Sequence, residues 1–137
     1  MIVIDAGALT DFLLGRPAAL GAVLNELDGR EHEALHGPEL IEPETLNALR
    51  GLMRGGKITT ERAGEAVTDL ASIRLNRYPH APLRSRVWEL RDKLTAYDAS
   101  YLALAEALDG SILIAGDAAL VAHAVDSLGQ ERVRSVS

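Results

Sequence analysis

Short apolar runs that suit β-strands alternate with amphipathic segments along this chain, and this alternation most narrows the folds open to it. The runs 2–4 and 112–114 contain only Ile, Leu and Val, which is typical of strands buried on both faces. Further strands are expected at 33–36, 73–75 and 132–136. Alternating strands and helices imply an α/β fold, in which a mostly parallel central sheet has helices on both faces.

The expected helices follow from apolar residues at helical spacing and from the Gly and Pro residues that bound them. They cover approximately 9–14, 17–28, 39–54, 61–70, 83–90, 96–108 and 118–128, with a turn at 78–82.

The length and composition fit one compact domain spanning residues 1–137. Hydrophobic residues make up 47% of the chain but aromatic residues only 4%, so the core must consist mainly of Leu, Ala, Val and Ile. The chain has no cysteine, which excludes disulfides, thiolate zinc ligands and a cysteine nucleophile. The N-terminal sequence MIVIDAGAL does not resemble a signal peptide, and no apolar run approaches membrane-spanning length. We therefore expect a cytoplasmic protein without a membrane partner.

Two aspartates lie just after the two most apolar expected strands. Asp5 comes after 2–4 and Asp117 after 112–114, each within two residues of a glycine that would let the backbone turn. In parallel α/β sheets, ligands bind beyond the carboxyl ends of the strands. Although 112 positions separate these acids in the sequence, they can therefore face one cleft.

Two further acids lie in the first turns of expected helices. They are Glu44, with Glu42 as an obvious competitor, and Asp98, which follows Thr95 as in a capping box. Each acid also has a purely structural explanation, because acids cap helices and interact favourably with the helix dipole. From the residues alone, both explanations stay open.

Four carboxylates in one place would repel one another, so such a group requires a cation. Mg²⁺ and Mn²⁺ prefer carboxylate and water oxygens, and either ion can polarise a phosphoryl oxygen and lower the pKa of a bound water. The net charge of −6 does not favour a polyanionic substrate. If four of the 20 acids hold a metal, however, 16 remain against 14 Lys and Arg, and the charge no longer excludes one.

Other catalytic motifs are missing from the sequence. The four histidines (His32, His36, His80 and His123) show no close zinc-ligand spacing, and neither GxxxxGK[ST] nor GxGxxG occurs. A receiver or haloacid-dehalogenase-like phosphate site is disfavoured, because the segment Asp5-Ala6-Gly7 lacks the DxD pattern and no suitable lysine follows Asp117.

Four segments, in this order, resemble a PIN-domain protein, specifically a VapC-type toxin of a toxin–antitoxin pair. They are MIVIDAGAL, PELIEPETLNALR, LTAYDASYLALAEAL and ILIAGDAAL, and the resemblance covers essentially the whole chain. It implies a three-layer α/β/α sandwich and a metal-dependent endoribonuclease. By the same resemblance, Asp5 and Asp98 are the usual Mg²⁺ (or Mn²⁺) ligands, with Glu44 and Asp117 completing the acidic pocket. Glu44 is favoured over Glu42 because the family acid stands two residues before the leucine of L-x-A-L-R, here Leu46.

The resemblance also implies the partners: an RNA substrate such as tRNA or rRNA, a second copy of the chain in a homodimer, and an antitoxin. The antitoxin is expected to insert a segment across the pocket and present a basic side chain to the acids. Arg50, Arg74 and Arg77 are candidate substrate contacts, although each also fits an ordinary solvated arginine.

Three positions depart from the family pattern. Gly7 stands where a small hydroxyl or Asn is common, Ala115 where Thr or Ser is common, and Ala119 where Arg is frequent. All four carboxylates remain, so metal binding should survive with weaker support around the ligands. The main alternative from another class is a PIN-fold binding module that has lost nuclease turnover.

Overall fold

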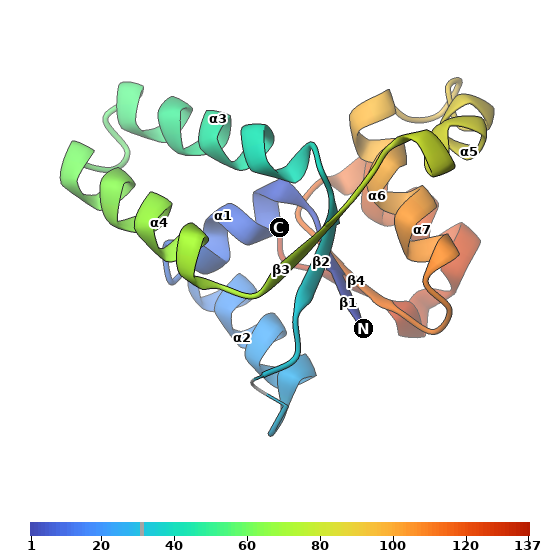
Figure 1. The fold of residues 1–137 in the computed structure, drawn as a ribbon, viewed down its shortest axis with the longest axis horizontal. Helices are drawn as coiled ribbons and strands as arrows, with labels where there is room; N and C mark the ends of the chain where they lie inside the picture. Colours follow the sequence, from blue (N-terminus) through green and yellow to red (C-terminus); the bar gives the residue numbers. More distant parts are fainter. Residues whose placement is uncertain (31) are drawn as a thin grey trace.

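The computed structural model describes residues 1–30 and 32–137 and arranges them in three layers around a central sheet (Figure 1). Within these residues the sheet has five strands in the order β3-β2-β1-β4-β5, and every neighbouring pair is parallel. The strands are β1 (Ile2–Ile4), β2 (Leu35–Pro38), β3 (Leu75–Tyr78), β4 (Ile112–Ala115) and β5 (Val133–Ser135). The expected α/β/α architecture is confirmed, and the sheet is more uniform than "mostly parallel".

Seven α-helices lie within the described residues. They are α1 (Ala6–Leu13), α2 (Pro17–Leu27), α3 (Ile41–Arg54), α4 (Thr60–Ser72), α5 (Arg84–Glu89), α6 (Ala96–Ala107) and α7 (Ala118–Leu128). Figure 1 shows α1 to α4 on one side of the strands and α5 to α7 on the other. Short 3₁₀ turns at Ala81–Leu83 and Gln130–Arg132 precede α5 and β5.

The centre of the sheet is buried in an aliphatic core. The side chains of Val3, Ile4, Leu113 and Ile114 are fully buried between the helical layers. Burial on both faces explains why these strands are continuous apolar runs instead of alternating ones.

Three expected elements were placed wrongly. The first helix begins at Ala6, three residues before the expected start, because the Asp5 side chain caps it and Gly7 lies inside the helix. Neither Gly7 nor Gly116 has a positive φ, so the turns after these strands do not depend on a backbone conformation that only glycine favours. The strands expected at 33–36 and 73–75 lie further along the chain, as β2 and β3, which pair with each other from Leu35–Leu75 to Pro38–Tyr78.

Within the described residues, no single helix is both long and apolar enough to cross a membrane. Only α1 and α2 together, bent by 98°, meet that test of length and composition.

Candidate metal centre

Asp5 lies at the carboxyl end of β1, where its carboxylate joins two parts of the fold. Oδ1 accepts a hydrogen bond from Ala8 N at 2.7 Å and so caps α1. Oδ2 accepts from the backbone N–H groups of Gly116 and Asp117, at 3.0 and 3.4 Å, and ties the ends of β1 and β4 together. The side chain is 4% exposed, and these bonds fix its orientation.

The two other aspartates also lie at helix starts. Asp117 follows β4 and caps α7, with Oδ1 accepting from Leu120 N at 2.9 Å. Asp98 is in the first turn of α6, where Thr95 is the N-cap and accepts from Asp98 N at 3.2 Å. The capping explanation is therefore correct for Asp117, and Asp98 occupies the first-turn position that suits an acid, but neither fact excludes the functional explanation. An ionised carboxylate has about four acceptor positions, of which a cap uses one.

All four predicted acids line a single cavity of about 310 Å³. Its lining residues are Asp5, Ala6, Gly7, Glu44, Asp98, Tyr101, Gly116 and Asp117. The acids come from four separate elements: the ends of β1 and β4 and the first turns of α3 and α6. The structure thus brings together every acid that the sequence singled out.

The pKa values of two acids reflect this crowding. Burial, together with the charges of Asp117, Asp5 and Glu44, raises the pKa of Asp98 to about 6. Burial also raises the pKa of Asp5, although the hydrogen bonds that it accepts from three backbone N–H groups counteract part of that effect. An electrostatic environment that disfavours a further negative charge favours a bound cation.

The structure distinguishes Glu44 from Glu42. Glu44 lines the cavity and accepts a hydrogen bond from the hydroxyl of Tyr101 at 2.6 Å. Glu42 is instead paired with Arg77, whose Nε lies 2.7 Å from Oε1. The choice of Glu44 from the sequence pattern therefore agrees with the geometry.

The donor set fits a hard divalent cation that keeps much of its water. Within residues 1–30 and 32–137, no three His, Cys, Asp or Glu side chains are positioned to coordinate one ion directly. Mg²⁺ typically binds through one or two carboxylates and retains several waters, and the shared cavity leaves room for them. The residues present therefore fit a partly hydrated Mg²⁺ or Mn²⁺ better than a zinc ion held by protein ligands alone.

The positions that depart from the family pattern differ in their surroundings. A Cβ added at Gly7 would lie 3.7 Å from Asp5 Oδ1, which is ordinary contact distance, so a side chain fits there. Ala115 is fully buried in β4, whereas Ala119 is exposed on α7.

Of the three arginines named as candidate substrate contacts, two bind other parts of the protein. Arg77 is paired with Glu42, and Arg74 donates a hydrogen bond to the carbonyl of His32 at 3.1 Å. Arg50 is exposed on α3.

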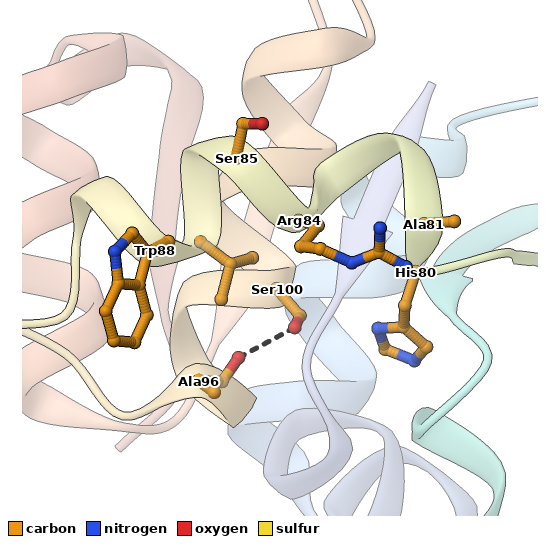
Figure 2. A pocket seen from close by; sticks show the side chains of 8 residues that line it. His80, Ala81, Arg84, Ser85, Trp88, Ala96 and Ser100 are labelled. Atoms are coloured by element: carbon orange, nitrogen blue, oxygen red, sulfur yellow. Dashed lines mark hydrogen bonds between the residues drawn. The ribbon is translucent and has the colours of Figure 1, made fainter.

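A larger cavity, of about 560 Å³, lies between α5 and the start of α6 (Figure 2). In Figure 2, Trp88 and His80 stand at opposite ends of this cavity, with Arg84 nearer to His80. None of the four acids lines it, and its lining is mainly apolar. Size alone does not make it the reactive site, because the ionisable carboxylates gather in the smaller cavity.

Sequence reasoning missed Tyr101 as part of the site. The residue lies within the helix expected at 96–108, and its side chain is 1% exposed. Its hydroxyl nevertheless reaches Glu44, which is 57 positions away on another helix. The only signal was that a buried tyrosine hydroxyl needs a hydrogen-bond partner.

The fold and the acidic cavity define a PIN-like α/β protein, and comparisons with known proteins agree. No protein-family model matches the chain. It is 40% identical over 122 residues to ribonuclease VapC1 of Mycobacterium tuberculosis, a match that covers 88% of each chain. It is also 37% identical over 118 residues to ribonuclease VapC9 of that organism, covering 84% of this chain and 85% of VapC9. The chain belongs to the VapC ribonuclease family.

A solved structure supports the fold. The match to the crystal structure of PAE2754 from Pyrobaculum aerophilum covers 98% of this chain and 88% of the PAE2754 chain, with a TM-score of 0.64 and 24% sequence identity. At this identity the likeness concerns the arrangement of strands and helices, and it agrees with the PIN-like architecture described above.

Proposed function

We propose that this protein is a Mg²⁺- or Mn²⁺-dependent endoribonuclease and the toxin of a type II toxin–antitoxin pair. One observation carries the proposal: Asp5, Glu44, Asp98 and Asp117 come from four separate elements and line one cavity beyond the carboxyl ends of β1 and β4. Relatives that match more than four fifths of the chain are named ribonucleases, which supports RNA, such as tRNA or rRNA, as the substrate.

In this proposal Asp5 and Asp98 hold the ion, and Glu44 and Asp117 support it. When bound, the ion would polarise a phosphoryl oxygen and lower the pKa of its bound water. Asp5 is suited to its role because three backbone N–H groups fix its orientation before any ligand arrives. Asp98 must release its proton to act as a ligand, and its raised pKa leaves it ionised above about pH 6.

The negative charge of the acidic cavity suggests how the proposed toxin activity is inhibited. Four acids without a cation form a negative cavity, which favours a partner that presents a basic side chain to it. We propose an antitoxin segment with this chemistry, bound across the cavity, and a homodimer as the active assembly. Light scattering should then give about twice the 14.7 kDa chain mass for the purified toxin.

The test is RNA cleavage by the purified protein in Mg²⁺ or Mn²⁺, with total RNA and tRNA as substrates. We expect cleavage by the wild type, none in EDTA, and none by Asp98→Asn. Asp92→Asn is the matched control, because Asp92 is an exposed acid between α5 and α6 and does not line the cavity. It should cut as well as the wild type.

Two outcomes would contradict this proposal. Cleavage that persists in EDTA or in Asp98→Asn would contradict the metal site. A wild type that binds Mn²⁺ but cuts no RNA would favour the alternative, a PIN-fold binding module without turnover, for which Gly7, Ala115 and Ala119 are the relevant departures.

A further inference from the structure

Tyr101 contacts the acidic cavity through its hydroxyl alone. The residue lies in α6, one helical turn after Asp98, and its side chain is 1% exposed. The ring packs in the main hydrophobic core, while the hydroxyl donates a hydrogen bond to Glu44 Oε1 at 2.6 Å. A rigid ring anchored in the core therefore ends at a carboxylate of the proposed metal site.

Ala6, the residue directly after Asp5, lines the same cavity as Tyr101. Tyr101 thus links two elements that supply the site, because its bond to Glu44 joins α6 to the first turn of α3. A contact that spans these elements can fix the distance between their acids, which a bond within one helix cannot do.

Glu44 needs such a contact more than Asp5 and Asp117 do. Asp5 and Asp117 have short side chains whose oxygens accept backbone hydrogen bonds. A glutamate side chain has an extra rotatable bond, and holding it in one rotamer costs conformational entropy. The bond from Tyr101 engages Oε1 of Glu44 and leaves Oε2 outside that bond.

A second observation shows that the bond selects one glutamate. Glu42 lies in the same first turn of α3, yet its carboxylate is bound by Arg77. The two glutamates therefore have different fixed partners: Arg77 for Glu42 and a core tyrosine for Glu44. A neutral hydroxyl donor orients a carboxylate and leaves its negative charge in place, whereas an arginine would neutralise that charge.

We propose that Tyr101 is a positioning residue that holds Glu44 in the orientation needed to support the metal ion. This inference rests on the proposed metal-dependent function. Removing a hydrogen-bond partner that orients a metal ligand commonly weakens metal binding by about 10-fold or more.

The experiment is calorimetric titration of Mn²⁺ into the wild-type protein and into Tyr101→Phe. We expect about 10-fold weaker Mn²⁺ binding by Tyr101→Phe, because Glu44 loses its fixed orientation. Tyr78→Phe is the matched control: it removes a hydroxyl that bonds His36 Nδ1 at 2.7 Å and does not line the cavity. Both variants should show a similar, small drop in melting temperature without metal, but Tyr78→Phe should bind Mn²⁺ like the wild type.

The same pair of measurements in a Glu44→Ala background tests whether Tyr101 acts through Glu44. There, Tyr101→Phe should change Mn²⁺ affinity by less than about twofold, because the group that it positions is gone. An equal loss of affinity in both backgrounds would overturn the proposal, and so would unchanged binding by Tyr101→Phe. A wild type that fails to bind Mn²⁺ at all would instead contradict the metal site itself, and with it the role given to Tyr101.

Discussion

Asp5 illustrates how one residue can serve both the fold and the proposed chemistry. Its carboxylate caps α1 and binds the β4–α7 connection, and it also faces the cavity that contains the other acids. The sequence left capping and metal binding as alternatives for each acid. In the structure they are compatible, because the capping bonds orient the carboxylate while further acceptor positions remain available.

The first prediction concerns Asp98 and pH. Its pKa is raised from an ordinary 3.8 to about 6 in the folded state, so the folded protein binds this proton more tightly than the unfolded chain. Stability without metal should therefore fall as the pH rises from about 4 to 6, as Asp98 ionises. Asp98→Asn removes this cost and should be more stable than the wild type in EDTA at pH 7.5. After allowance for partial exposure, the expected gain is on the order of 1 kcal/mol.

Urea unfolding at pH 4.0 and 7.5 measures this effect. The gain should shrink towards zero at pH 4.0, and Asp92→Asn, an exposed control, should show little gain at either pH. A destabilised Asp98→Asn at pH 7.5 in EDTA would show that Asp98 contributes mainly to the fold.

The second prediction concerns the missing small polar side chain at Gly7. The structure leaves space for one, with the added Cβ at 3.7 Å from Asp5 Oδ1. Gly7→Ser should therefore fit, place a hydroxyl near Asp5, and raise Mn²⁺ affinity by up to about 10-fold. Gly21→Ser in α2 is the matched control, since it makes the same change at a helical position with open space around it. Titrations that show equal affinity for both variants would contradict a supporting role at position 7.

Among the structural elements, the start of α7 allows the two roles of Asp117, capping the helix and binding metal, to be tested separately. Asp117→Asn keeps an oxygen that can accept from Leu120 N but removes the charge, so it should weaken Mn²⁺ binding without a large loss of stability. Asp117→Ala removes both and should also cost about 1 kcal/mol of unfolding free energy. Chemical unfolding and Mn²⁺ titration of the two variants test this directly. Equal Mn²⁺ binding by Asp117→Asn and the wild type would exclude Asp117 from the metal site.

The elements also show what the sequence could predict. Helix α7 matches its expected range, 118–128, because Asp117 caps it and Gly129 ends it. Strands β2 and β3 begin inside their expected ranges but extend beyond them, because pairing between the two strands includes residues that local signals assign to turns. Gly37 and Pro38 are such residues, yet they pair with Arg77 and Tyr78.

The candidate site was predictable where a rule links sequence to topology. Acids that follow parallel strands converge at one edge of the sheet, which accounts for Asp5 and Asp117. Glu44 and Asp98 required the family pattern, because their first-turn positions suit capping equally well. The Tyr101–Glu44 bond could not be predicted, since it depends on how α3 and α6 pack together.

At the scale of the whole molecule, the sheet order determines where the acids meet. In β3-β2-β1-β4-β5, strands β1 and β4 are parallel neighbours, so their carboxyl ends lie side by side. Their paired residues, such as Ile2 and Ile112, are nevertheless far apart in the sequence. Helices α3 and α6 come from opposite sides of the sheet and add the remaining two acids (Figure 1). The net charge of −6 is thus partly concentrated in one cavity that a cation would neutralise.

Anomalous diffraction at the manganese edge, from crystals soaked in Mn²⁺, tests directly whether the four acids hold a metal ion. We expect an anomalous peak in the cavity, adjacent to Asp5 and Asp98, and no peak there in Asp98→Asn crystals. A wild-type cavity without a peak under conditions that support RNA cleavage would contradict a metal site at these four acids, and so would a peak found only elsewhere on the protein.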